Sequence, residues 1–373
     1  MARKNRRDIV KASEVGLYLV SSRTVRRAFL LGNDPATGRD RSYRRRVIEK
    51  RMEDLASVFA VEVCDYSIAD NHFFAILRIR PDLVPAWNDR EVARRWLRVN
   101  RSRLELEPEP SAEMVDRLVM DDQRLGRARK ALSCLSEFMG CLKQAVACEA
   151  NLYDEVTDNF WGGRFQAVPL ENEATLVASS AYVNMQLIRA ERADGLADSE
   201  YTSAYVRLRD EQLQGLRDGR REVRNGEESD GRNEGRTEGP SSGWMQPVEV
   251  CVEKSGYDGA AAGRRASNDG YVRMTFAEQR ELIDSLLKYE RDVQVSRDAF
   301  LKPELPAVLE RVGVNAEQWV RAVLGIRRRF NHELLIMQKR IAEANEASLR
   351  ALGLIDSQEQ LQLEARSRPL PGP

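Results

Sequence analysis

The sequence contains no run of eighteen apolar residues, which is about the length that a membrane-spanning helix needs. No apolar stretch follows the basic residues at its start, so we expect neither a membrane span nor a secretory signal. Five cysteines occur without a C-x-x-C pair, and an odd number of them favours a reducing cytoplasm over a disulfide framework. Histidine is scarce, with two residues in 373, which excludes any metal site built from several histidines.

Charge is abundant and unevenly distributed. The composition is 32% charged with a net charge of zero, yet residues 2–51 hold fifteen Lys or Arg against five Asp or Glu. Such an excess can neutralise the phosphates of a nucleic acid and release their counterions. It can equally form a solvated basic surface, so the charge pattern alone leaves both interpretations open.

Hydrophobic periodicity predicts an α+β fold in the first half of the chain. We expect strands at 15–21, 61–68 and 72–80 and near 165–170, and helices at 41–59, 89–99, 113–152 (with a break near Gly126), 172–190 and 203–223. The order strand–helix–strand–strand–helix–strand is that of a ferredoxin-like sandwich, an antiparallel sheet with helices on one face. That fold alone does not indicate a function.

The second half of the chain has a different composition. Residues 219–243 are rich in Gly, Arg, Glu, Asp and Ser and cannot bury enough apolar surface to fold, so we expect a flexible linker. It would separate a first domain, residues 1–218 with an insertion at about 81–130, from a C-terminal all-α region at 244–373 with a disordered tail. We expect helices there from Thr275 to about 291, at about 304–312 and at about 315–351.

One strand carries a pattern with chemical meaning. Asn71-His72-Phe73-Phe74 resembles an Asn-His-x-His strand, in which two histidines flank one residue. Alternate side chains of a strand share a face at a spacing of about 6.6–6.8 Å, so two imidazoles so placed can hold one divalent ion.

Three further segments extend the resemblance. Trp161-Gly-Gly-Arg164-Phe165 is similar to a Trp-x-Gly-Arg-Phe/Tyr element. The segment from Tyr182 to Ala190 is similar to a Tyr-Ile-x-Leu-Asn-Pro-Val-Arg-Ala element. The segment from Tyr18 to Arg23 is similar to a Tyr-His-Val-x-x-Arg strand. Their order over residues 15–205 resembles the single-tyrosine HUH transposase family, nearest to its REP-associated branch. The insertion and the C-terminal helices resemble an enlarged bacterial subgroup.

The resemblance implies a function and a set of site residues. In this family a tyrosine attacks a phosphate of single-stranded or hairpin DNA, held by Mg²⁺ or Mn²⁺, and the strand is later rejoined during DNA transposition. The resemblance implies that His72 is a metal ligand and that Tyr153, by its position, is the catalytic nucleophile. His72 should then face the helix that holds Tyr153. It also implies a homodimer in the bacterial cytoplasm, associated with the nucleoid. The arginines expected to bind DNA are Arg23, Arg26, Arg27, Arg44, Arg45 and Arg164.

Two departures argue against an intact enzyme. Phe74 occupies the place of the second metal histidine, and a phenyl ring offers no lone pair. The residue one turn after Tyr153 is Thr157, where the family usually has an acidic or amide ligand. His332 could replace the missing ligand only if the C-terminal region docked on the sheet. We therefore expect impaired cleavage.

Alternatives remain at this point. The chain could bind hairpin DNA without cutting it, and composition does not distinguish DNA from an RNA hairpin. His72 could be an ordinary hydrogen-bonded residue, Tyr153 an ordinary helix residue, and Arg164 a partner for a carboxylate. Trp161 and Phe165 are more typical of core anchors than of base-stacking platforms.

Overall fold

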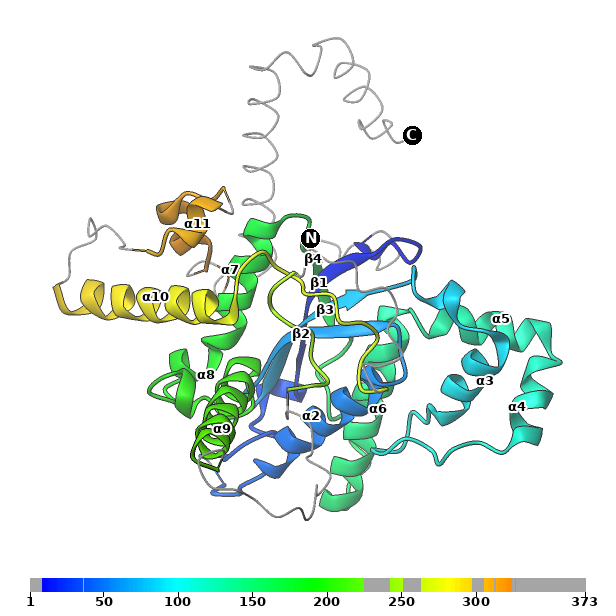
Figure 1. The fold of residues 1–373 in the computed structure, drawn as a ribbon. Helices are drawn as coiled ribbons and strands as arrows, with labels where there is room; N and C mark the ends of the chain where they lie inside the picture. The colour runs from blue at the N-terminus through cyan, green and yellow to red at the C-terminus, as the bar shows by residue number, and fades with distance from the viewer. Residues whose placement is uncertain are drawn as a thin grey trace, which may run out of the picture.

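The protein is built around a four-stranded antiparallel sheet with the strand order β2-β3-β1-β4 (Figure 1). The structure is a computed structural model that describes residues 9–35, 37–224, 242–250, 263–296, 305–311, 313–323 and 326. The strands are β1 (Gly16–Arg23), β2 (Val61–Ile68), β3 (His72–Ile79) and β4 (Gln166–Pro169). The predicted α+β fold with an antiparallel sheet is therefore confirmed.

One face of the sheet packs against α2 (Tyr43–Ala56) and α6 (Leu135–Asp154) (Figure 1). Alternate residues of β3 point to this side, since Phe73 and Ala75 share a core cluster with Phe138 and Leu142 of α6. The period-two pattern of the strand and the 3.6-residue period of the helix explain why these residues meet.

The opposite face is covered as well, by α7 (Glu173–Asn184), and α10 (Phe276–Ser296) packs against α7 in the same core cluster. Leu19, Phe74 and Ile76 point to this side and share that cluster with Tyr182. The expectation of helices on one face only is therefore wrong. Apolar side chains point to both faces of the sheet, so both faces must be covered.

The remaining elements extend these two layers. The predicted helix at 113–152 is in fact three helices, and the breaks fall at 120–121 and 132–134 instead of at Gly126, which lies inside α5. Asp121 caps α5 by accepting a hydrogen bond from the backbone N–H of Arg124. The elements that extend the two layers are η1 (Val25–Arg27), η2 (Val84–Ala86), α3 (Asp89–Arg98), α4 (Ala112–Val119), α5 (Asp122–Ala131), α8 (Gln186–Arg189), η3 (Leu196–Asp198), α9 (Ser203–Arg224) and α11 (Val308–Arg311).

The C-terminal region shares the two cores in the part that the structure describes. Trp244 belongs to the cluster on the α2 and α6 side, whereas Tyr271 and Trp319 belong to the α7 side. These residues therefore do not form a separate all-α region. Helix α9 continues to Arg224, and residues 225–241 of the expected linker lie outside the described residues.

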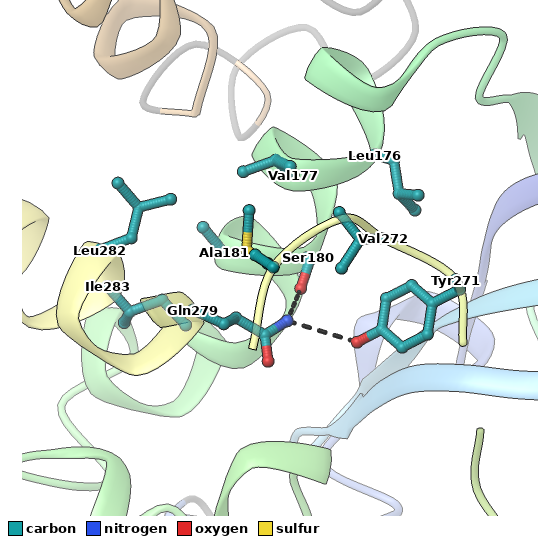
Figure 2. Close-up of a pocket in the computed structure, with 10 residues that line it drawn as sticks. Leu176, Val177, Ser180, Ala181, Tyr271, Val272, Gln279, Leu282 and Ile283 are labelled. Carbon is teal, nitrogen blue, oxygen red and sulfur yellow. Dashed lines mark hydrogen bonds between the residues drawn. The ribbon is translucent and has the colours of Figure 1, made fainter. Parts of the chain in front are cut away.

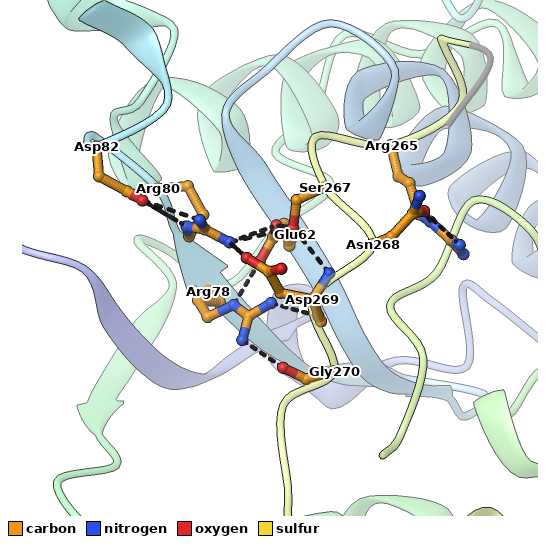
Figure 3. Close-up of polar contacts among 9 residues, drawn as sticks. All are labelled: Glu62, Arg78, Arg80, Asp82, Arg265, Ser267, Asn268, Asp269 and Gly270. Atoms are coloured by element: carbon orange, nitrogen blue, oxygen red, sulfur yellow. Dashed lines mark hydrogen bonds and ion pairs between the residues drawn. The ribbon is translucent and has the colours of Figure 1, made fainter. Parts of the chain in front are cut away.

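Buried ion pairs hold this returning segment on the sheet (Figure 3). Glu62 of β2 is fully buried, pairs with Arg78 of β3 and with Arg80, the first residue after that strand, and accepts a hydrogen bond from Ser267 at 2.5 Å. Arg78 also donates to the backbone oxygens of residues 269 and 270, and Arg80 pairs with Asp269 at 2.7 Å. Each buried charge is matched, which is the condition for burying it.

Among the described residues no helix has both the length and the apolar character needed to cross a bilayer.

Candidate functional site

Phe74 is a core residue of the α7 face of the sheet. Its side chain is 2% exposed, and its ring lies between those of His72 and Tyr182, with centroid distances of 5.2 and 5.3 Å. Both contacts are edge to face, with interplanar angles of 83°. This is the favourable geometry of aromatic packing. The position of the expected second metal ligand is therefore filled by a packed hydrocarbon ring.

His72 begins β3 and is kept neutral by its surroundings. Burial lowers the pKa of its imidazole to about 4, the neighbouring Arg23 acts in the same direction, and a hydrogen bond with Gln186 opposes both. Its Nδ1 lies 2.7 Å from Oδ1 of Asn71. The ring therefore has a polar partner on its own chain, as expected for a structural histidine.

These residues do not fit a divalent ion. Among the described residues, no group of three or more His, Cys, Asp or Glu side chains is placed to hold a metal. His72 faces Phe74 and Gln186, neither of which gives a strong ligand set for Mg²⁺ or Mn²⁺, which prefer several oxygen ligands. His332, the other histidine, lies outside the described residues.

Tyr153 lies on the other side of the sheet. It is in the last turn of α6, whose buried residues pack with Phe73 and not with Phe74. The tyrosine is 69% exposed, and its ring contacts Tyr43 at the start of α2. The expectation that His72 faces the helix of Tyr153 is therefore wrong, because successive residues of β3 point to opposite faces. The structure does not bring this nucleophile candidate and this ligand candidate together.

Two of the arginines expected to contact DNA are structural instead. Arg44 is 1% exposed, and its guanidinium donates to Asp154 at 2.6 Å and to the backbone oxygen of Leu30 at 3.3 Å. A residue so buried cannot reach a phosphate, so the prediction for Arg44 is wrong. Arg45 is half-buried, pairs with Asp70 at 3.8 Å and lies over the ring of Tyr201.

The other four expected arginines gather at one end of β1. We call Arg23, Arg26, Arg27 and Arg164 the arginine rim. All four are exposed, and among the described residues no carboxylate lies within ion-pair distance of them. The loop before β4 runs beside the end of β1. The N–H of Gly162 donates to the backbone oxygen of Arg23, and Thr24 and Trp161 form an isolated antiparallel β-bridge. That pairing places the loop that carries Arg164 beside the end of β1 that carries Arg23.

The turn after β1 displays two of these arginines in a strained conformation. Arg26 and Arg27 have φ angles of 52° and 59°, a region that costs a non-glycine residue roughly 1–2 kcal/mol. Thr24 holds the turn by donating its hydroxyl to the oxygen of Ala28 at 2.6 Å, and Nδ2 of Asn71 donates to the oxygen of Arg27 at 3.1 Å. The surrounding structure therefore fixes both arginines in an outward position.

Trp161 and Phe165 are core anchors, as the sequence favoured. Trp161 packs edge to face on Phe73, and its indole N–H donates to the oxygen of Lys143 at 2.8 Å. Phe165 is 5% exposed and lies in the same cluster. These two side chains fix the loop that carries Arg164.

Sequence reasoning missed the buried carboxylate of Asp65. It accepts hydrogen bonds from Ser180, Asn184, Ser203, Arg207 and Tyr271. Figure 2 shows how Gln279 completes this network by donating to Ser180 and Tyr271. The network joins β2, α7, α9 and the C-terminal segment on the face that His72 and Phe74 share.

A β-bulge explains the placement of Asp65. The pairing of β2 with β3 shifts between Val63 and Asp65, so Cys64 and Asp65 both face α7 while Tyr66 returns to the other side. The sequence does hold a signal of this kind. The apolar residues of the strand are two apart at 61 and 63 and again at 66 and 68, with a step of three between the pairs.

Compared with known protein families and with curated proteins, the chain matches none. Among solved structures it is similar to one described as a REP-associated tyrosine transposase bound to a REP hairpin. The two share 11% sequence identity with a TM-score of 0.32, over 54% of this chain and 82% of that one. At that identity and TM-score the likeness does not place the chain in a family.

Proposed function

We propose that this chain binds hairpin or single-stranded DNA through the arginine rim and does not cut it. The observation that carries the proposal is the packing of Phe74 between His72 and Tyr182, in the place where the resembling family has a metal ligand. The resemblance of four ordered sequence segments supports the DNA partner. The strand order β2-β3-β1-β4 is also the order of a ferredoxin-like sandwich, the fold that the resemblance implies.

The arginine rim supplies what DNA binding needs. Four exposed guanidinium groups on two adjacent segments can each neutralise a phosphate, and such contacts provide most of the affinity of a sequence-independent site. Arginine also forms bidentate hydrogen bonds with phosphate oxygens. None of these contacts requires a metal, so binding can persist where cleavage does not.

The cleavage reaction of the family lacks two of its requirements here. A tyrosine hydroxyl and a metal-bound phosphate must approach each other within about 3–3.5 Å. Tyr153 and His72 lie on opposite faces of the sheet, and Phe74 offers no ligand. The transposase activity implied by the resemblance, its Mg²⁺ or Mn²⁺ and its homodimer therefore remain predictions, and our proposal includes only the binding step.

Binding is tested by fluorescence anisotropy with a labelled DNA hairpin in EDTA. We expect the Arg26→Ala/Arg27→Ala double variant to weaken binding at least ten-fold. The matched control is Arg124→Ala/Arg127→Ala on α5, which removes two arginines that are also exposed but lie away from the rim, and it should bind like the wild type. Equal loss in both variants, or no binding by the wild type, would refute the proposal. Preference for an RNA hairpin of the same stem would transfer it to RNA.

Cleavage is tested on a denaturing gel after incubation with labelled hairpin strands and Mn²⁺. We expect no covalent protein–DNA adduct. An adduct that disappears in Tyr153→Phe would show that the nucleophile works and that our proposal of binding without cleavage is wrong. Sedimentation with and without DNA determines whether the binding form is the homodimer that the resemblance implies.

A further inference from the structure

Tyr43 and Tyr153 form an exposed aromatic surface where α6 ends and α2 begins. Tyr153 is 69% exposed and Tyr43 is 37% exposed, and their ring centroids are 5.1 Å apart with planes inclined at 52°. Among the residues whose burial the structure describes, every other aromatic side chain is buried or half-buried. Leu152 and Val156, exposed by 77% and 44%, flank the pair. A cluster of exposed apolar side chains on an otherwise charged surface is typical of a binding site.

The buried side chain of Arg44 holds the tyrosine pair in place. The Nε of Arg44 donates to the hydroxyl of Tyr43 at 3.1 Å, and the guanidinium carbon lies 5.5 Å from the centre of the Tyr43 ring. Arg44 is itself buried and paired with Asp154. Tyr43 is therefore fixed in orientation and Tyr153 rests against it, so a ligand would order few side chains on binding.

The same buried arginine connects the tyrosine pair to the arginine rim. The guanidinium carbon of Arg44 lies 5.8 Å from the ring centre of Phe160. The backbone oxygen of Phe160 accepts a hydrogen bond of 2.9 Å from the N–H of Val25, the residue before Arg26. The tyrosine pair and the turn that carries Arg26 therefore both border the buried contact between Arg44 and Phe160.

We propose that the Tyr43–Tyr153 pair stacks an unpaired base of the nucleic acid whose phosphates lie on the arginine rim. The inference rests on the proposed DNA binding and deepens it, because it gives Tyr153 a binding role through its ring instead of a chemical role through its hydroxyl. Every base has a π-face, so stacking on tyrosine tolerates any sequence. The ligand is a hairpin with a single-stranded extension, since bases inside a duplex are already stacked.

Charges beside the pair restrict how the strand can lie. Asp154 is paired with Arg44 and lies 4.0 Å from Arg41, whereas Glu155 and Asp158 are exposed. These two carboxylates repel phosphate, so the backbone must follow the rim while the base turns toward the tyrosines. A duplex, with phosphates on both sides, is disfavoured at this place. A strand end with one flexible backbone is accommodated.

The test compares two DNA hairpins with the same stem, one blunt and one with a four-nucleotide single-stranded extension. We expect Tyr153→Ala to weaken binding of the extended hairpin about ten-fold and to leave the blunt hairpin unchanged. Tyr153→Phe is the matched control, because it keeps the ring and removes the hydroxyl, and it should bind both hairpins like the wild type. With 2-aminopurine at successive positions of the extension, one position should lose fluorescence on binding, and Tyr153→Ala should restore it.

The outcomes separate this inference from the proposed function. If the rim variant loses binding while Tyr153→Ala binds the extended hairpin normally, the stacking inference is wrong and DNA binding stands. If the wild type binds neither hairpin, the proposed function is wrong. If Tyr153→Ala converts a dimer to a monomer in sedimentation and leaves the 2-aminopurine signal unchanged, the tyrosines form an interface between copies, which also overturns the inference.

Discussion

The ring of Tyr182 meets the edge of Phe74 at a centroid distance of 5.3 Å and an interplanar angle of 83°. Tyr182 belongs to a segment whose sequence resembles the transposase family, and Phe74 stands where the resembling Asn-His-x-His pattern has its second histidine. The helix that bears Tyr182 thus packs directly on this position. Phe74 is therefore part of the core, and a histidine at this position would change stability before it changes chemistry.

Phe74→His tests this relationship. An imidazole at this buried position loses aromatic burial and leaves a polar nitrogen to be satisfied, so we expect the free energy of unfolding to fall by roughly 2–4 kcal/mol in urea titration. We also expect no DNA adduct with Mn²⁺, because Tyr153 lies beyond the sheet. The control Phe74→Leu, which stays apolar, should cost roughly 1–2 kcal/mol. An adduct formed by Phe74→His would mean that the nucleophile reaches His72 after all.

The strands show how much of this fold the sequence determines. The bounds of β2 and β3 follow from two apolar runs and the turn at 69–71, and the prediction differs from the structure by at most one residue. The same local information does not determine which face of β3 packs against α6. Alternating side-chain direction defines two faces of the strand but does not indicate which helix covers each face. The contact of Phe74 with Tyr182 likewise depends on packing between residues more than a hundred positions apart.

The buried carboxylates were missed for a related reason. Glu62 and Asp65 lie in an apolar strand, where a charge signals a partner but does not identify it. Their partners include Ser267 and Tyr271, which follow a segment of polar composition that reads as a linker. The interactions that close the second face are thus long-range, and no local periodicity reports them.

Lower pH should weaken folding through His72. The folded-state pKa of about 4 lies below the ordinary value of 6.5, so the unfolded chain takes up the proton first as the pH falls. The stabilising contribution is complete above pH 6.5 and is lost progressively between pH 6.5 and 4, by about 3 kcal/mol in total. Urea titrations at several pH values should show this slope as a difference from His72→Gln, which cannot titrate. Parallel pH profiles of the two proteins would contradict the burial of a neutral imidazole.

Salt should weaken DNA binding in proportion to the phosphates that the arginine rim contacts. The slope of log affinity against log salt concentration is about −0.7 per neutralised phosphate for a single strand and −0.9 for a duplex. Arg164→Ala should therefore make the slope less negative by about 0.7–0.9 and weaken binding similarly for unrelated hairpin sequences. The measurement is anisotropy at four or more salt concentrations. Arg90→Ala, an exposed arginine of α3 paired with Asp116, is the control and should leave the slope unchanged.

Asp65→Asn should be among the most destabilising single changes. The substitution removes the charge that Arg207 faces across 2.7 Å in a buried site, and an unpaired buried guanidinium costs about 3–5 kcal/mol. Asp82→Asn is the control, since Asp82 is 44% exposed in its pair with Arg80 and its loss should cost at most about 1 kcal/mol. Similar unfolding free energies for the two variants would show that the Asp65 network contributes little.

Gly270→Ala tests whether the C-terminal segment is part of the fold. Gly270 passes so close to the segment at 249 that an added Cβ would lie 1.7 Å from the backbone oxygen of Glu249. Backbone must move to relieve that overlap, and the oxygen of Gly270 also accepts a hydrogen bond from Arg78, so the shift would disturb the ion pairs around Glu62. We expect a fall in Tm of several degrees, measured by circular dichroism. Gly215→Ala in α9 is the control: nothing lies within 4 Å of its added Cβ, and alanine should stabilise the helix by about 0.5–1 kcal/mol. Equal Tm values for Gly270→Ala and the wild type would mean that this segment detaches from β3 without cost to the core.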